Sequence, residues 1–416
     1  ALTLLLLIDS VFTRNPGEYV AIVLMAAAGG LLIAAAQDLL VIFVGLELLS
    51  LCLYVLTAFA KSSGKSAEAA IKYYLFGGMS AAFLLFGFSY LYGITGSTNL
   101  HKILLASFYS SASGGAPLLY VALVLIAAGL GFKVAAAPFH LWAPDTYEGA
   151  PAPAAAFIAS VSKVASFALL ISISAAAVHV LDGVHAIQFV TETPGPPPKY
   201  LGLWMPWSLI LTLLAAASML LGNLAALAQI SVRRLLAYSA IAHAGYILLG
   251  LAYFSHSNTS ENAILYYVLT YGLTTIGAFG LVSVVERATG SDRLDAFLGL
   301  HKRNPLLAAV LLVLFLSLAG IPPLVGFWAK FNLFAAVLGV SAGPVAFGLV
   351  ALAIAMSAVS LYYYLQVLKR AYVMPAASEG PIKAHWLTMM VLLGIAGAVV
   401  VLGCFPALLQ GWIASF

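Results

Sequence analysis

Long apolar segments recur from one end of this chain to the other, and they constrain its fold more than any other feature. About 20 apolar residues in a helix span the hydrocarbon core of a bilayer, and most of these segments reach that length. Only 8% of the residues are charged, against about 25% in a soluble domain. The sequence therefore predicts an all-α polytopic membrane protein. A transmembrane β-barrel would show short alternating segments instead.

Eleven candidate spans follow from the hydropathy pattern, and two of them are too long for one straight helix. They lie at about 19–37, 39–60, 67–95, 117–149, 151–180, 204–230, 234–254, 262–286, 305–340, 344–372 and 386–408. The two long ones contain Pro138 with Pro144, and Pro322 with Pro323. Proline removes a ladder hydrogen bond and clashes with the preceding turn, so we expect both spans to be broken.

Broken spans at similar places in two halves of a membrane protein indicate an inverted repeat with its working site at the breaks. Non-helical backbone at membrane depth persists only where it is buried in protein or lines a hydrated cavity. We therefore expect two inverted five-helix repeats at 19–180 and 204–372, followed by a helix at 386–408. Residues 1–18 resemble the end of a helix, and the start at Ala1 predicts further helices before it.

Basic residues in the loops predict the orientation, because Lys and Arg concentrate on the cytoplasmic side. The other side has only Lys102 and Lys199. We expect Cys52 and Cys404, both in apolar runs, to be small buried hydrophobic residues. The basic residues of the predicted cytoplasmic side are Arg14, Lys61, Lys65, Arg233, Arg234, Arg287, Arg293, Lys302, Arg303, Lys369, Arg370 and Lys383.

Five ionisable residues remain inside the spans, and they are the main candidates for function. Each costs roughly 2.5–3.5 kcal/mol at the centre of a membrane helix, so five cost on the order of 10 kcal/mol, comparable with the stability of a whole domain. Burial disfavours a charged lysine and a nearby carboxylate favours it, so a lysine can load and release a proton, which arginine cannot. We interpret these residues as a proton relay along a hydrated path: Glu47, Lys72, Lys133, Lys163 and Lys330.

Structural alternatives exist for several of these residues. Lys72 lies about one turn inside its span and could reach the cytoplasmic surface instead, and Glu47 could simply neutralise one lysine. His140 and His243 are secondary candidates, each equally compatible with a hydrogen bond between helices. Pro138 opens the helix beside Lys133, and Pro322 and Pro323 open the helix before Lys330. The span ends hold three acids that we expect at the membrane interface: Asp38, Asp145 and Glu148.

The sequence has no cysteine cluster for an iron–sulfur centre and no GxGxxG or Walker motif. The chain therefore has no visible means of harvesting energy itself. Either it exchanges one ion for another, or partner subunits drive it.

Four motifs resemble the antiporter-like membrane subunits of respiratory complex I (NADH:quinone oxidoreductase) and their Mrp antiporter and membrane-bound hydrogenase relatives. Three carry the superfamily pattern: GFKVAAAPFHLWAPDTYEGAPAPAAAFIASVSK, RRLLAYSAIAHAGYILLG and SLAGIPPLVGFWAKF. The fourth, AIKYYLFGGMSAAFLLFGFSYLYGITGSTN, is similar to the subunit N type. The resemblance runs from about residue 18 to the end. It departs from the bacterial members in helix number, since these generally have fourteen helices and eleven are expected here.

The resemblance implies a role for each buried charge. Glu47 and Lys133 match the pair that gates proton loading, Lys163 the connecting lysine, and Lys330 the lysine that leads protons outward. Lys72 matches a further lysine of the family.

The resemblance also implies a proton-translocating membrane-arm subunit of the bacterial inner membrane, with no redox centre of its own. NADH, FMN, iron–sulfur clusters and quinone are then expected in partner subunits. The expected neighbours are the M and K subunit types and membrane lipid, with no nucleic acid. An Mrp-type cation/proton antiporter subunit, a ferredoxin- or hydrogenase-linked relative, and a membrane scaffold remain alternatives.

Overall fold

A computed structural model describes residues 1–6, 13, 15–110, 116–190, 204–255, 258–376 and 380–415. Apart from two isolated backbone bridges between loop residues, the regular structure of these residues is helical. Ten helices are long and apolar enough to span a membrane, which confirms the predicted all-α polytopic fold. They are α2 (Pro16–Ala35), α3 (Leu39–Thr57), α4 (Gly64–Thr95), α6 (Ala116–Val134), α8 (Ala152–Phe157) continuing through a π-helical turn (Ile158–Ser162) into α9 (Lys163–Val190), α10 (Trp204–Leu227), α11 (Val232–Ala252), α12 (Asn258–Thr289), α16 (Pro344–Tyr372) and α17 (Trp386–Cys404).

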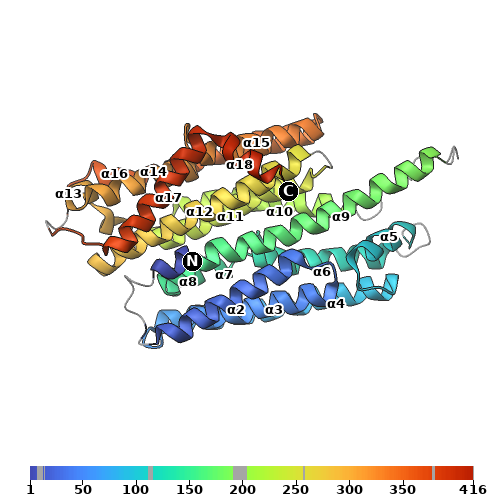
Figure 1. Ribbon diagram of the computed structural model, residues 1–416, viewed down its shortest axis with the longest axis horizontal. Coiled ribbons are helices and arrows are strands. Elements are labelled where there is room, and N and C mark those ends of the chain that lie inside the picture. The colour runs from blue at the N-terminus through green and yellow to red at the C-terminus, as the bar shows by residue number, and fades with distance from the viewer. Residues whose placement is uncertain are drawn as a thin grey trace.

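The remaining predicted span consists of two shorter helices, α14 (Pro305–Ala319) and α15 (Val325–Val340), which meet at a break. The helices lie roughly side by side along the long axis of the molecule (Figure 1). In that view α2, α3 and α4 lie on one side, α9, α11 and α12 lie in the middle, and α14 to α17 lie on the other side. The central helices α11 and α12 are almost entirely buried within the protein.

Both breaks fall where the prolines predict them. The first separates α6 from α7 (Trp142–Gly149) and contains Pro138. The backbone N–H before this proline, that of Ala137, donates to the hydroxyl of Ser218 on α10 over 2.8 Å. The second break separates α14 from α15 and contains Pro322 and Pro323. Pro144 causes no break, because it lies in the first turn of α7, where proline is tolerated.

Two matching turns support the predicted internal repeat. The sequences TGSTNL (95–100) and TGSDRL (289–294) follow α4 and α12, and each turns at a glycine with positive φ, 66° at Gly96 and 73° at Gly290. Each turn pairs with the loop that precedes α3 or α11, which would be corresponding helices of the two predicted repeats. We propose 19–180 and 204–372 as the repeat boundaries. The backbone bonds, all 2.9 Å, are Leu39 N–H to Thr98 O and Leu100 N–H to Gln37 O in the first turn, and Val232 N–H to Asp292 O and Leu294 N–H to Ile230 O in the second.

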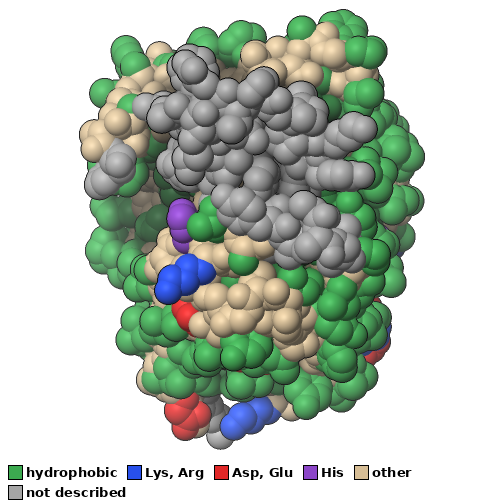
Figure 2. Space-filling view, turned by 90° about the vertical axis from the view of Figure 1, so that its right-hand side faces the viewer, with side chains coloured by type: hydrophobic (Ala, Val, Ile, Leu, Met, Phe, Trp, Pro, Cys, Tyr) green, Lys and Arg blue, Asp and Glu red, His purple; other side chains and the backbone are tan. Residues whose placement is uncertain are grey.

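Several short helices occupy predicted loops or ends. They are α1 (Leu2–Leu5), α5 (Leu100–Ser110), a 3₁₀ turn (Leu294–Phe297), α13 (Leu300–Arg303) and α18 (Pro406–Ile413). Figure 2 views the molecule from the right-hand side of Figure 1, where α5 lies; hydrophobic side chains border this end, and few Lys or Arg side chains appear on its described part. Arg14 and Lys199, which entered the orientation prediction, lie outside the described residues.

The two cysteines differ in environment. Both are free thiols. Cys52 is buried in α3, as predicted, but the prediction was wrong for Cys404, which is exposed at the last residue of α17. An apolar run does not reveal which face of its helix points away from the protein, and a membrane helix has apolar residues on both faces.

Candidate functional site

Lys133 is buried at the end of α6, one residue before the chain leaves the helix. Its ammonium donates to the hydroxyl of Ser50 on α3 over 2.6 Å, and its Nζ lies 5.4 Å from the centre of the Phe132 ring. Glu47, half-buried, precedes Ser50 by three residues, so both side chains share one face of α3. The structure thus brings Glu47 and Lys133 to the same region but gives Lys133 a hydroxyl, not the carboxylate, as its direct partner.

Lys163 is less exposed than Lys133 and is the first residue of α9 after the π-helical turn. Its exposed fraction is 2%. The ammonium donates to the carbonyl of Ala240 on α11 over 2.8 Å, and Nζ lies 5.9 Å from the centre of the Tyr271 ring. Single π-helical turns within membrane or soluble helices frequently mark functional sites. Here the turn directly precedes a buried cation.

Lys330 on α15 is buried against the end of α14. The last carbonyls of a helix have no partner within the helix, and the ammonium donates to two of them, those of Leu318 (3.1 Å) and Ala319 (2.9 Å). A third bond of 2.8 Å reaches the hydroxyl of Ser357 on α16. The break before Lys330 therefore does more than interrupt a helix: it supplies the acceptors that hold the ammonium at membrane depth.

His243 on α11 lies between Lys163 and Lys330. Its Nδ1 is 2.8 Å from the hydroxyl of Tyr267. Its ring centre is 4.8 Å from that of Tyr271, which adjoins Lys163, and 5.8 Å from that of Tyr246. The Nζ of Lys330 lies 5.4 Å from the Tyr246 ring.

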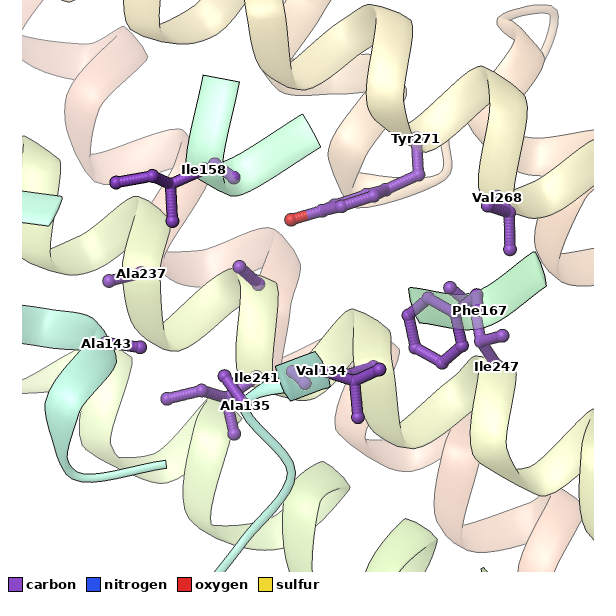
Figure 3. Packing of buried hydrophobic residues seen from close by; sticks show 14 of the residues in the cluster. Val134, Ala135, Ala143, Ile158, Phe167, Ala237, Ile241, Ile247, Val268 and Tyr271 are labelled. Carbon is purple, nitrogen blue, oxygen red and sulfur yellow. The ribbon is translucent and has the colours of Figure 1, made fainter. Parts of the chain in front are cut away.

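The centre of the protein therefore holds a row in which aromatic rings connect the two lysines through His243. Ala240, His243 and Tyr246 follow one another at three-residue intervals, so they share one face of α11. Figure 3 shows buried hydrophobic residues packed together in the core, among them Ile241 on α11, Val134 next to the first break and Tyr271 on α12. We call Lys163, His243 and Lys330, with Tyr271 and Tyr246, the central row.

A small cavity adjoins the central row. Its volume is about 10 Å³, and His243, Tyr267, Tyr271 and Ser317 are among its lining residues. This is close to the volume that one water molecule needs. The Nε2 atom of His243 is buried and has no hydrogen-bond partner among the described residues. Buried polar atoms in small polar cavities are usually satisfied by ordered water, so the geometry suits a hydrated step beside His243.

Lys72 lies apart from the central row. Its side chain is 40% exposed and pairs with Glu68 over 2.7 Å and with Asp145 over 2.8 Å. Asp145 also accepts from Arg234 over 2.6 Å, and Glu148 accepts from Arg234 over 3.1 Å. Together with Lys65 these residues line a cavity of about 150 Å³ among α4, α7 and α11. The structure thus places Lys72 at a partly exposed cluster of alternating charges, which agrees with the surface alternative.

His140 is buried within the first break. Its ring centre lies 6.4 Å from that of Tyr238 on α11. Its Nδ1 has no hydrogen-bond partner among the described residues. His140 therefore does not belong to the central row, although a buried and unsatisfied ring nitrogen beside a helix break is a place where ordered water is expected.

Gly320 is the first residue of the second break and lies against the side chain of Lys330. We expect Gly320→Ala to destabilise the protein. Its φ is 89°, and an added Cβ would lie 3.0 Å from Cδ of Lys330. The left-handed conformation costs a side-chain-bearing residue roughly 1–2 kcal/mol, and displacement of Lys330 adds to that. The measurement is the temperature at which half of the solubilised complex survives, by size-exclusion chromatography.

Gly339→Ala on α15 is the matched control, because nothing lies within 4 Å of the added methyl group. If the thermal midpoint of Gly320→Ala is no lower than that of Gly339→Ala, the proposed tight fit around Lys330 is contradicted.

Within the described part of the chain, no group of three or more His, Cys, Asp or Glu side chains could hold a metal ion.

Comparison with known proteins gives a consistent result over nearly the whole chain. The family described as NADH:quinone oxidoreductase/Mrp antiporter, transmembrane, matches residues 36–191 and 200–361. The chain is 53% identical over 408 residues to NADH-quinone oxidoreductase subunit N 2 of Acidobacterium capsulatum, a match that covers 97% of this chain and 78% of that protein.

Two solved structures have the same fold. A chain of respiratory complex I from Thermus thermophilus, solved with bound aureothin, is 37% identical with a TM-score of 0.75, over 99% of this chain and 84% of that one. A chain of the Mrp complex from a Dietzia species has a TM-score of 0.78 over 100% of this chain and 82% of that one, but is only 23% identical and shows the fold alone.

Proposed function

The chain belongs to the NADH:quinone oxidoreductase/Mrp antiporter transmembrane family, and we propose that its buried lysines carry the protons that such an oxidoreductase moves across the membrane. It is a multi-pass integral membrane protein and a proton-translocating membrane-arm subunit of the N type. The proposal concerns how it does this. A proton loads at Lys133 beside Glu47, passes to the central row at Lys163, and leaves from Lys330.

The central row carries this proposal. Lys163 and Lys330 are bonded to carbonyl and hydroxyl oxygens. A lysine with only neutral acceptors is not held permanently charged by a counter-ion, so it can release its proton when a neighbouring charge changes. His243 between them has one ring nitrogen bonded and the other free to exchange a proton. Since its two nitrogens differ in this way, His243 can accept a proton on one side and pass it on from the other.

Energy for proton movement has to come from partner subunits. We propose that neighbouring subunits of the M and K types adjoin this chain in the bacterial inner membrane, and that NADH, FMN, iron–sulfur clusters and quinone bind elsewhere in the assembly. A movement of charge near Glu47 would change whether the charged or the neutral form of Lys133 is favoured. The half-buried position of Glu47 on α3, one turn from the serine that holds Lys133, supports this end as the input.

His243→Gln tests the relay, because glutamine keeps a hydrogen bond to Tyr267 but cannot carry a proton. We expect a roughly tenfold slower proton step, less than the roughly 100-fold that a positioned acid–base group contributes, because water beside the ring can take over part of the transfer. The complex is isolated as the NADH-oxidising band of a native gel that contains this chain and is reconstituted into vesicles. The initial rate of proton movement and the protons moved per NADH oxidised are then measured.

The matched control is His301→Gln on α13, since His301 lies outside the central row and bonds the carbonyl of Ala371. Equal proton yields from wild type and His243→Gln would refute a role for His243. If the chain migrates without NADH oxidation and vesicles show sodium-dependent proton exchange, the Mrp-type alternative replaces the proposal.

A further inference from the structure

A cavity of about 550 Å³ lies between α15 and α16, and Lys330 of the relay is among its lining residues. Its walls are apolar, with Phe331, Phe334 and Ile354 among them. Among the described residues that line it, Lys330 and Ser357 are the two with polar side chains. Phe331 is 53% and Ile354 57% exposed, so the cavity opens on the outer surface of the helices. A volume of about 300–1,000 Å³ is typical of sites for small molecules.

The positive charge of Lys330 indicates that a molecule bound in this cavity should carry an anionic group. Among the described residues no carboxylate lies within 4.0 Å of its ammonium, whose partners are two carbonyls and one hydroxyl. An unpaired charge at membrane depth is costly. An anionic group at this end of the cavity would be attracted by the ammonium. It could also accept a hydrogen bond from the hydroxyl of Ser357, which otherwise donates over a long 3.5 Å to the carbonyl of Ala319. The other side chains that line the cavity are apolar and suit a hydrocarbon chain.

From this combination we propose that the cavity binds a long-chain fatty acid, with the carboxyl group at Lys330 and Ser357 and the acyl chain between α15 and α16. The acid enters from the bilayer in its neutral form. When Lys330 has released its proton in the relay, the acid transfers its own proton to the amine, and an ammonium–carboxylate pair results. A phospholipid fits less well, because its charged group stays at the membrane interface and it carries two chains.

Binding would inhibit proton transfer, a consequence that rests on the function proposed for Lys330. The carboxylate stabilises the charged form of the lysine, and a lysine held in that form cannot pass its proton on. The fatty acid would therefore act at the outward end of the relay without touching the site of NADH oxidation in the partner subunits.

Photolabelling of the intact complex tests the binding site directly. A palmitic acid analogue with a diazirine in the chain is irradiated with the purified complex, and labelled peptides are identified by mass spectrometry. We expect label on α15 and α16, displaced by palmitate but not by hexadecanol or by phospholipid. Ala358→Trp, which fills the cavity from its wall, should remove most of the label. Ala355→Trp, at an exposed position of α16 that does not line the cavity, should not.

The same variants give a functional readout. About tenfold more palmitate should be needed to halve proton transfer in Ala358→Trp than in wild type, which corresponds to about 1.4 kcal/mol. Absence of label from α15 and α16, equal labelling of Ala358→Trp, or label only on a neighbouring subunit would overturn the site. Displacement by hexadecanol would overturn recognition of the carboxylate, and displacement by phospholipid would assign the cavity to lipid. Labelling does not depend on pumping, so its failure is distinguishable from failure of the relay.

Discussion

Lys133→Met is expected to assemble normally and to lose most proton transfer through this subunit. Methionine is similar in length to lysine and apolar, so it fits the buried position without an uncompensated charge. The substitution removes the titratable group next to the first break, and a positioned acid–base group contributes on the order of 100-fold to proton transfer. Protons moved per NADH oxidised by the reconstituted complex should fall, with the amount of complex on a native gel unchanged.

Two further variants separate proton transfer from mere charge. Lys133→Arg keeps a positive charge but cannot release it, so it should be as defective as Lys133→Met. Lys302→Met makes the same lysine-to-methionine change at an exposed position of α13 and should behave as wild type. Normal pumping by Lys133→Met would remove Lys133 from the relay. If Lys133→Met loses proton pumping but Lys133→Arg pumps normally, the role of Lys133 is electrostatic and does not include carrying a proton.

The breaks and the buried lysines could be predicted from the sequence because their causes are local. Proline interrupts a helix through its own ring and its missing N–H, so Pro138 and the pair at 322–323 identify the breaks without knowledge of the fold. A lysine far from both ends of a long apolar segment is unusual wherever the segment packs. Lys133, Lys163 and Lys330 are such lysines, and all three are buried. Sequence spacing was enough for both features.

The partners of those lysines could not be predicted, because they come from distant parts of the chain. Lys163 bonds a backbone carbonyl of α11, and no side-chain pattern reveals a carbonyl acceptor. Ser50 offered a faint signal, as a hydroxyl one turn from Glu47 in an apolar helix. The π-helical turn before Lys163 left no pattern at all.

Lys72 shows how tertiary contacts decide between alternatives that a sequence leaves open. Local spacing placed it about one turn inside its span, compatible with both a buried relay and an exposed position. In the structure the ammonium of Lys72 donates to Asp145, which is 73 residues away on α7, the short helix after the first break, and this contact holds Lys72 at the partly exposed cluster. That acid also pairs with Arg234 on α11, in the second of the proposed repeats. The cluster therefore links α4, α7 and α11, which are distant in the sequence, and no local pattern predicts such a link.

Lys330→Met is expected to stop proton transfer and also to weaken the protein, unlike Lys133→Met. The ammonium of Lys330 satisfies the carbonyls of Leu318 and Ala319, which the end of α14 leaves without helical partners. A buried acceptor left unsatisfied costs about 1–3 kcal/mol. The variant should therefore lower both the protons moved per NADH and the midpoint of thermal inactivation of the complex.

Lys330→Gln separates the two roles of this lysine, because its amide N–H groups can still donate to carbonyls but cannot carry a proton. We expect a midpoint close to that of wild type together with a loss of proton transfer as large as in Lys330→Met, on the order of 100-fold. Normal pumping by Lys330→Gln would mean that Lys330 only completes the end of α14, and protons would then have to leave the central row by another route. Because stability and pumping are measured on the same vesicles, a fall in both for Lys330→Gln would count against the separation of roles and point to a single structural function.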